Sequence, residues 1–203
     1  MPTQTRRERA REERRTLILR AARDLAESEG WDAVTTRRLA EAVDYSQPVL
    51  YGHFKNMDAI ADAVALEGIA ELTEVFRAAR SSATDDTAAL RALAHAYLEY
   101  ADQHPAVYEA MFVRRTDLQF GRSETPASLI DAFNEIRAVV EPFATDDPES
   151  LTEVFWSALH GQATLNQGAR LRGQQRTARV DLLVDLLVVP VVDGGGASFP
   201  AQD

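Results

Sequence analysis

Residues 35–60 have the sequence TTRRLAEAVDYSQPVLYGHFKNMDAI, and the pattern predicts two short helices. The first covers about 36–43. The second begins at Ser46, a residue type that favours helix N-termini, with Pro48 in the first turn, where its missing N–H loses no hydrogen bond. Asp44, in the junction, tolerates the left-handed backbone that such turns commonly need. The side chains expected to pack between the helices are Leu39, Ala40, Val43, Leu50 and Phe54. This arrangement predicts a helix-turn-helix, whose second helix enters the major groove of DNA.

The outer surface of this motif carries side chains suited to DNA. Gln47 can form two hydrogen bonds with an adenine edge, and Pro48 or Val49 can contact a thymine methyl group. Arg37 can reach a phosphate or a base, and hydroxyl groups and the ammonium group of Lys55 can hold phosphates. The full set of candidate DNA contacts is Thr35, Thr36, Arg37, Ser46, Gln47, Pro48, Val49, Tyr51, His53 and Lys55. From the pattern alone, an ordinary helical corner with an exposed glutamine and tyrosine is an open alternative.

The same residues resemble the DNA-binding domain of the tetracycline-repressor (TetR) family. The similarity covers about residues 12–65, and the Leu-Tyr-x-His-Phe run at 50–54 is its most specific part. The resemblance implies that the second helix is the recognition helix, and that Tyr51 and the region of Lys55 contact phosphates.

Three residues depart from the family's usual pattern. Asp44 replaces a glycine in the turn, and Gly52 weakens local helicity by up to ~1 kcal/mol relative to alanine. Met57 stands where the family often has a lysine that contacts phosphate. That contact therefore falls to Lys55 or is missing.

The net charge of −10 is unevenly distributed along the 203 residues. Of the 22 basic and 32 acidic side chains, residues 1–55 hold 11 and 9. A basic footprint is typical of DNA-binding segments, so the first quarter suits DNA and the acidic remainder does not. Residues 1–11 are expected to form a flexible basic arm. Its arginines resemble an extension that some family members lay along the minor groove, and a solvated tail is the alternative.

Composition excludes several other classes of protein. The absence of cysteine excludes disulfide frameworks, zinc knuckles and cysteine nucleophiles. No apolar run approaches the ~18 residues of a membrane span, and no apolar signal segment follows the first arginines. We therefore expect a cytoplasmic protein with no metal, cofactor or membrane partner.

Apolar residues recur at helical spacing through the rest of the chain. We expect an all-α protein of about nine helices, in which a three-helix helix-turn-helix domain precedes a larger helical domain. The expected boundaries are 12–58 for the first domain, 59–190 for ligand binding and dimerisation, and 191–203 for a disordered tail.

Two segments of the larger domain, 104–112 and 156–161, resemble the regulatory domain of a TetR subgroup marked by a Trp-x-x-x-His-Gly pattern. The resemblance implies that a small molecule binds among the helices and that the last two helices pair with a second subunit. The residues expected to line the pocket are Tyr97, His104, Met111, Phe112, Phe133, Phe155, Trp156 and His160. For each phenylalanine or methionine taken alone, packing in the core is the simpler interpretation. For His160, the simpler interpretation is a hydrogen-bonded histidine in the core or at an interface.

The helix expected at about 174–189 is apolar on most sides, with Asp181 and Asp185 as a polar stripe. Such a helix must be buried on most sides, and a second subunit is the simplest cover. A membrane anchor is the alternative, but the run is short and contains two aspartates. The residues expected between two copies are Leu151, Phe155, Leu159, Leu183, Val184 and Leu187.

The leading hypothesis is a homodimeric, sequence-specific transcriptional regulator, a repressor released from a palindromic DNA operator by a small-molecule effector. A helical-bundle enzyme is an alternative, because His95 and Glu99 are four residues apart and other histidines could join them at a metal. However, the sequence has no His-Glu-x-x-His, Gly-x-Ser-x-Gly or phosphate-binding glycine loop. A non-specific architectural DNA-binding protein is a third possibility, which the acidic larger domain disfavours.

Overall fold

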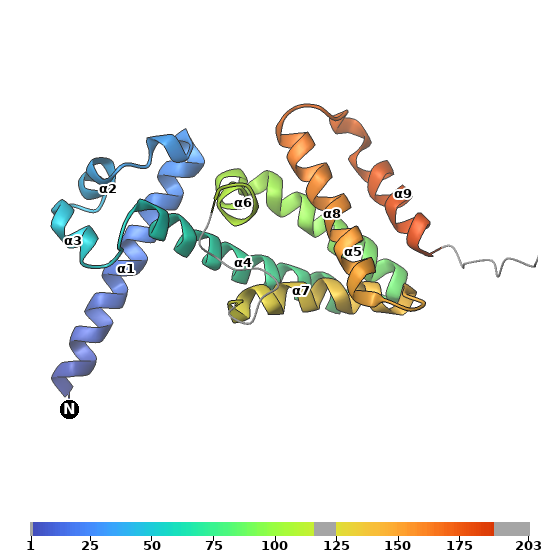
Figure 1. Ribbon diagram of the computed structural model, residues 1–203, viewed down its shortest axis with the longest axis horizontal. Coiled ribbons are helices and arrows are strands. Elements are labelled where there is room, and N and C mark those ends of the chain that lie inside the picture. Colours follow the sequence, from blue (N-terminus) through green and yellow to red (C-terminus); the bar gives the residue numbers. More distant parts are fainter. Residues whose placement is uncertain (1, 116–124, 189–203) are drawn as a thin grey trace, which may run out of the picture.

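The structure is a computed structural model, and it describes residues 2–115 and 125–188. Within these ranges every regular element is a helix: nine α-helices and three short 3-10 helices (Figure 1). The prediction of an all-α chain with about nine helices is confirmed. None of the described helices is long and apolar enough to cross a membrane. The tail expected at 191–203 lies outside the described residues.

The N-terminal domain contains α1 (Pro2–Glu29), the 3-10 turn η1 (Trp31–Ala33), α2 (Thr36–Ala42), α3 (Gln47–Tyr51) and the start of α4 (Met57–Ser81). Gly30 follows α1 with a φ of 83°, a left-handed conformation that glycine adopts without steric cost. The side chain of Asn56 accepts a hydrogen bond from the N–H of Ala59 and so caps the start of α4. These local signals place α2 and α3 beside the middle of α1.

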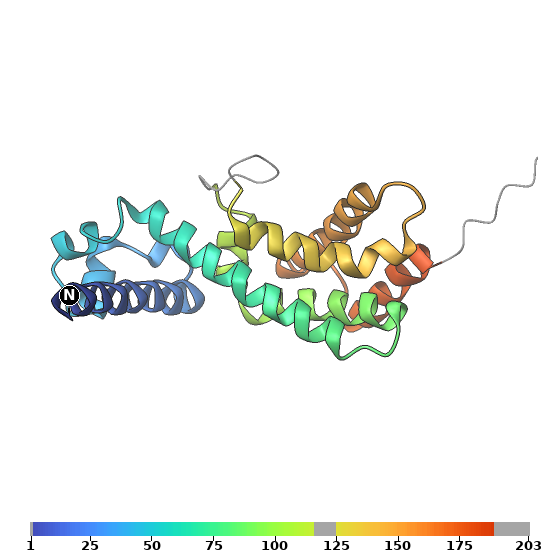
Figure 2. The same ribbon diagram turned by 90° about the horizontal axis from the view of Figure 1, so that it is seen from below.

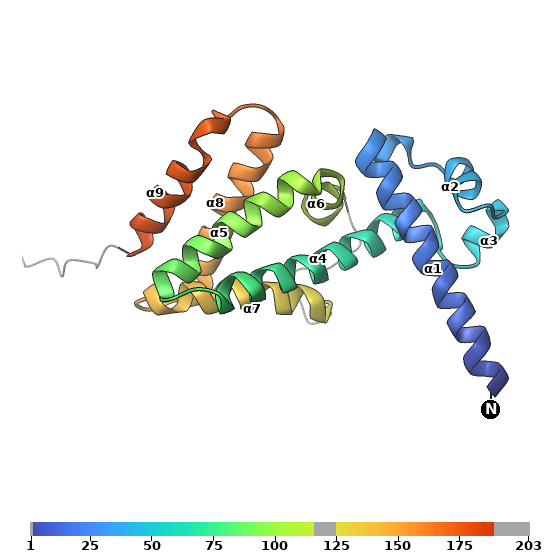
Figure 3. The same cartoon turned by 180° about the vertical axis from the view of Figure 1, so that it is seen from behind.

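The first helix begins ten residues earlier than the domain boundary that we expected. Residues 2–11, expected to be a flexible arm, form the first turns of the 28-residue α1 and project past α3 (Figures 1 and 3). The run RRERAREERR at 6–15 explains the difference, because arginine, glutamate and alanine are all good helix formers. The flexible arm is therefore corrected to a helical extension.

The larger domain adds five helices to the rest of α4: α5 (Asp86–Gln103), α6 (Pro105–Phe112), α7 (Ala127–Val140), α8 (Pro148–Gln167) and α9 (Arg176–Val188). Two short 3-10 helices, η2 (Glu141–Phe143) and η3 (Gly173–Gln175), lie after α7 and before α9. The carboxylates of Asp85 and Asp147 cap α5 and α8. Pro142 lies in η2, directly after α7, because the residue before a proline disfavours the helical conformation.

Helix α4 connects the two domains. It starts close to α3, contacts α1, and then packs against α5, α6 and α7 (Figure 2). Gly68 permits the contact with α6, because a Cβ at this position would lie 2.3 Å from Val107 Cγ1 and 3.0 Å from Met111 Sδ. Only glycine fits there without a shift of α6.

Candidate nucleic-acid interface and effector cavity

The turn between α2 and α3 directs one face of α3 outward. Asp44 has the expected left-handed conformation, with a φ of 54°. The side chains predicted to pack between the helices are all buried: Leu39, Ala40, Val43, Leu50 and Phe54. The opposite side of α3 exposes Gln47, Pro48, Val49 and Tyr51, the last with 53 % of its surface accessible. Residues predicted to contact bases therefore share one accessible surface.

Tyr51 and Thr36 connect α3 to α2 at the edge of this surface. Their hydroxyl oxygens lie 3.2 Å apart, within hydrogen-bond distance. A phosphate oxygen beside the pair can accept the hydroxyl proton that this bond leaves free. Thr35 is already engaged, since its Oγ1 accepts a hydrogen bond from the N–H of Arg38 at 3.3 Å. Ser46 precedes α3 with an exposed side chain that forms no capping bond.

Arg37 and Arg38 are neighbours with different partners. Arg37 donates from Nε to Glu41 at 2.8 Å on the surface, and this hydrogen bond raises the pKa of Arg37. Exposed pairs of this kind contribute little to stability, so a phosphate can take the place of Glu41. Arg38 donates from both terminal nitrogens to the Glu29 carboxylate, at 2.8 and 2.5 Å, and thereby attaches α2 to the end of α1.

The extension of α1 brings basic side chains to the junction of α3 and α4. The Arg15 guanidinium lies 4.5 Å from the centre of the Phe54 ring, in a cation–π contact. Burial lowers the pKa of His53, and the positive charges of Arg11, Arg14 and Arg15 lower it further. These side chains and an exposed lysine form what we call the junction cluster: Arg11, Arg14, Arg15, His53 and Lys55. The sequence indicated the charge of this segment but not its position, which depends on α1 being helical.

The end of α1 also holds the start of α6. The Glu27 carboxylate accepts hydrogen bonds from the N–H groups of Ala106 and Val107, at 3.1 Å each. These N–H groups have no partner within the helix, and the helix dipole favours a negative charge beside them. Trp31 Nε1 donates to the Ala106 carbonyl oxygen at 2.8 Å. Glu27 and Trp31 were missed by the sequence analysis, because their partners are 75 to 80 positions away.

His104 belongs to this contact between domains. Arg23 donates to Glu71 at 2.6 Å, and its second terminal nitrogen lies 3.4 Å from His104 Nδ1. The rings of His104 and Tyr100 pack together with their centres 4.7 Å apart. His104, which was expected in the pocket, directly precedes α6, lies against α1 and does not line the cavity described below; its role in ligand binding stays a prediction.

A cavity of about 590 Å³ lies among α4, α5, α6, α7 and α8. Four of the predicted pocket residues line it: Tyr97, Phe112, Phe133 and Trp156. Leucines, isoleucines, Phe76 and two glutamates complete most of the wall. Met111 and Phe155 were also expected there, but both are buried in the core between helices. Neither lines this cavity, because periodicity does not distinguish a side chain in a cavity wall from one in the core, and their role in ligand binding stays a prediction.

A chain of hydrogen bonds leads from this cavity to His160. Trp156 Nε1 donates to the Tyr97 hydroxyl oxygen at 3.1 Å, which lies 2.9 Å from the Tyr108 hydroxyl oxygen. The Tyr108 hydroxyl lies 2.7 Å from His160 Nδ1. Burial raises the pKa of Tyr97 to about 12 and also raises that of Tyr108, whereas burial lowers the pKa of His160. All three groups are therefore neutral at neutral pH. His160 does not line the cavity and is joined to it through Tyr108, and its expected role in ligand binding stays a prediction.

Helix α9 is attached to α5 through its polar stripe. Arg91 on α5 donates from Nε to Asp181 at 2.8 Å, and its NH2 nitrogen lies 3.6 Å from Asp185. The two aspartates therefore face α5, and other sides of α9 are left to solvent.

The residues expected between two copies need a correction on α8 and α9. Phe155, Leu159 and Val184 have no exposed surface, because they form part of the chain's own core. Leu151, Leu183 and Leu187 are half-buried. The apolar side chains that these helices expose most are Val154, Leu182 and Leu186, at 63 %, 61 % and 69 %. The spacing of apolar residues identified α8 and α9 as apolar helices. It did not indicate which of their apolar side chains face outward.

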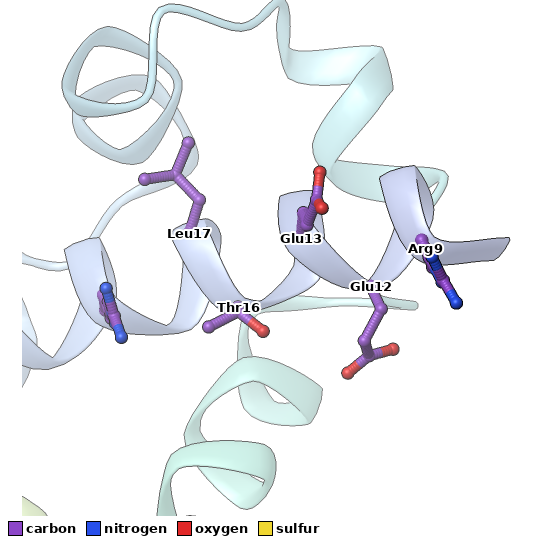
Figure 4. A pocket seen from close by; sticks show the side chains of 6 residues that line it. Arg9, Glu12, Glu13, Thr16 and Leu17 are labelled. Carbon is purple, nitrogen blue, oxygen red and sulfur yellow. The ribbon is translucent and has the colours of Figure 1, made fainter. Parts of the chain in front are cut away.

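A hollow on the surface of α1 is lined by side chains of that helix alone: Arg9, Glu12, Glu13, Thr16, Leu17 and Arg20 (Figure 4). Because no second element closes over it, it offers much less apolar enclosure than the cavity of the larger domain. Within residues 2–115 and 125–188, no group of three or more histidine and carboxylate side chains is arranged to hold a metal ion.

Known proteins with similar sequences match both domains. The family model for bacterial regulatory proteins of the tetR family matches residues 18–64, and the model for the tetracyclin repressor-like C-terminal domain matches residues 90–189. An uncharacterised HTH-type transcriptional regulator of Mycobacterium tuberculosis is 31% identical over 150 residues, which are 72% of this chain and 67% of that protein.

Two further similarities concern one short segment of the sequence and the fold of the chain. The tetracycline repressor protein class A from transposon 1721 of Escherichia coli is 48% identical over 54 residues, which are 27% of this chain and 25% of that repressor. The crystal structure of a TetR-family transcriptional regulator from Pectobacterium atrosepticum shares the fold, with a TM-score of 0.66 and 22% identity over 88% of this chain and 92% of that one. The subgroup with the Trp-x-x-x-His-Gly pattern stays a prediction.

Proposed function

This chain belongs to the TetR family of bacterial transcriptional regulators, and we propose that it is a repressor that binds a palindromic operator as a homodimer and dissociates when a small molecule fills the cavity. The outward face of α3 is the observation that carries the proposal, because its polar and apolar groups match the edges of base pairs in a major groove. The family is non-enzymatic, so the enzyme alternative is set aside.

In this proposal the contacts divide into base recognition and phosphate binding. Gln47 bonds an adenine edge, and Pro48 and Val49 contact thymine methyl groups. The phosphates are held by the hydroxyl pair of Thr36 and Tyr51, by Arg37, and by the junction cluster. Binding is therefore expected to weaken steeply with salt, because each neutralised phosphate releases counterions.

Two copies are needed to read a palindrome. Their recognition helices would enter successive major grooves about 34–36 Å apart. The exposed leucines of α9 and the exposed Val154 of α8 support an interface that includes these two helices, because exposed apolar side chains gain stability when a second copy covers them.

Release of DNA requires that the effector favour a different arrangement of the domains. The cavity is lined by Ile69, Leu72 and Phe76 of α4, and the same helix starts close to α3. Tyr108 and Phe112 of α6 lie at or behind the cavity wall, and the start of α6 is bound by Glu27 of α1. A ligand that moves α4 or α6 would therefore change the position of α3.

Genome-wide footprinting of the protein would identify its operator, and gel-shift titration with that operator tests the contacts. We expect Tyr51→Ala to lose operator binding while its circular dichroism and oligomeric state stay unchanged, because Tyr51 is exposed. Tyr51→Phe keeps the ring and removes only the hydroxyl, so its affinity should fall between the two. Normal affinity of Tyr51→Ala would show that α3 does not contact DNA as proposed.

The same titration separates a repressor from an architectural protein. A repressor prefers its operator over unrelated DNA by a factor of about 10³ or more at a fixed salt concentration. Equal affinity for all sequences would instead support an architectural role.

A further inference from the structure

The wall of the effector cavity combines aromatic rings with carboxylates. Rings reach it from five helices: Phe76 from α4, Tyr97 from α5, Phe112 from α6, Phe133 from α7 and Trp156 from α8. The only charged groups among the described residues that line it are Glu149 and Glu153, in the first two turns of α8. Glu149, Glu153 and Trp156 follow one another at spacings of four and three residues, so they share one face of α8.

Among the described residues, basic side chains offset these two carboxylates only in part. Arg137 lies 4.0 Å from Glu149, but its other terminal nitrogen is closer to Glu141, at 3.6 Å. Among the described residues, Glu153 forms no ion pair. Arg77 and Arg80 of α4 both bond the same carboxylate, that of Glu135 on α7, and so are already paired. The cavity entrance at α8 is therefore negative.

The polar groups of the inner wall are bonded to one another. The Trp156 N–H donates to Tyr97, and the Tyr97 hydroxyl lies in hydrogen-bond distance of Tyr108, which continues to His160. The polar groups of Trp156 and Tyr97 are thus already engaged with protein partners, and the negative face of an aromatic ring attracts cations. An anionic ligand would have to bring its charge beside two carboxylates with no cationic partner among the described lining residues.

We propose that the effector is a lipophilic cation: an apolar, preferably aromatic body that carries a quaternary or protonated nitrogen or a phosphonium centre. The body fills the space between the aromatic rings, and the positive charge lies beside Glu149 and Glu153 at the entrance. This inference rests on the proposed role of the cavity as the effector site, to which it adds the chemical class of the ligand.

Tetraphenylphosphonium and tetraphenylborate test the sign of the charge, because they share a shape and differ in charge. Isothermal titration calorimetry with the full chain and no DNA should show binding of the phosphonium ion and at least about tenfold weaker binding of the borate. The inference is overturned if the borate binds as tightly as the phosphonium, or if the phosphonium does not bind.

Substitution of the carboxylates tests the site. Glu149→Gln with Glu153→Gln should weaken phosphonium binding by about tenfold or more and leave borate binding the same or stronger. Asp131→Asn is the matched control, because Asp131 is exposed on the neighbouring α7 and does not line the cavity. Glu153→Gln alone should give a smaller loss, which keeps the test available if the double variant melts early. Unchanged phosphonium affinity in a folded double variant would refute the site.

Gel-shift assays of the unliganded wild type distinguish an error in the proposed class of ligand from an error in the proposed regulatory function. If operator binding is found and the calorimetry fails, only the class of ligand is wrong. If no DNA is bound but the phosphonium ion binds selectively, the proposed regulatory function is wrong and the cation site stands.

Discussion

Gly68 sets the distance between α4 and α6. A methyl group at this position would lie 2.3 Å from Val107 Cγ1, far inside van der Waals contact. We predict that Gly68→Ala lowers the free energy of unfolding by about 1–3 kcal/mol, although alanine is otherwise the better helix former. Urea denaturation followed by circular dichroism measures the change.

A double-mutant cycle provides the control for this clash. Val107→Ala removes the methyl group that the new Cβ would meet, so Gly68→Ala should cost less stability in that background than in the wild type. Additive effects of the two substitutions would mean that the cost arises elsewhere in the helix.

The half-buried His160 makes stability depend on pH in one direction. Burial lowers its pKa in the folded chain, so the unfolded chain takes up a proton first as the pH falls. The stability contributed by the neutral imidazole is therefore complete above the ordinary pKa of about 6.5 and decreases as the pH falls below it toward the folded pKa.

We predict that the wild type loses more unfolding free energy between about pH 7.5 and about pH 5 than His160→Gln does. Urea denaturation at both values measures this difference. His53, whose pKa is also lowered, is present in both proteins and cancels in the comparison. Equal pH dependence would contradict the assignment to His160.

At the scale of single residues, sequence reasoning succeeded where the determinants are local. The outward position of Gln47 and Tyr51 follows from the helical spacing of the buried residues within the same few turns. The places of His104 and Val184 could not be derived this way, because they depend on which distant helix covers each side chain. His104 is covered by α1, and Val184 by the core of its own chain.

At the scale of elements, the carboxylate of Glu27 connects α1 to α6. We predict that Glu27→Ala lowers the free energy of unfolding by about 1–3 kcal/mol, because two backbone N–H groups lose a charged acceptor. Hydrogen exchange at Ala106 and Val107 should accelerate in the same variant, which locates the effect.

Glu13→Ala is the matched control, since Glu13 is exposed on the same helix in the surface hollow. Its stability and its exchange at α6 should equal those of the wild type. If Glu27→Ala behaved like this control, the contact between α1 and α6 would contribute nothing in solution.

The limits of the helices were largely predictable, because caps and breakers are encoded in adjacent residues. Pro105 and Pro148 are the first residues of α6 and α8, and Gly30 directly follows α1, all positions that these residue types favour. The exception is the start of α1, where the number of charges suggested a flexible arm. Helix propensity, which the same arginines and glutamates carry, favoured the extension instead.

At the scale of the whole molecule, charge and packing are divided between the domains. The acidic larger domain holds its apolar side chains in a core around α4, and its carboxylates repel DNA everywhere except at the far end, where α3 lies (Figure 1). The division of charge follows from the sequence, but the cavity could not be derived from it, because the cavity depends on how α4 crosses from one domain to the other.

The exposed leucines of α9 give the prediction that concerns the assembly. Leu182 and Leu186 are four residues apart and mostly exposed, so they form one apolar strip on the outside of the chain. We predict that Leu186→Glu raises the dissociation constant of the dimer by at least about tenfold, because a carboxylate would be buried against the second copy. Sedimentation velocity over a range of concentrations measures the change.

Val113→Glu is the control, since Val113 is 55 % exposed directly after α6 and belongs to neither α8 nor α9. It should remain as dimeric as the wild type. Leu186→Glu should also bind a full operator much more weakly while keeping the affinity of one domain for one half-site, because a monomer lacks the second recognition helix. A Leu186→Glu protein that stays dimeric would place the interface on another surface, and Val154 of α8 would then be the next position to substitute.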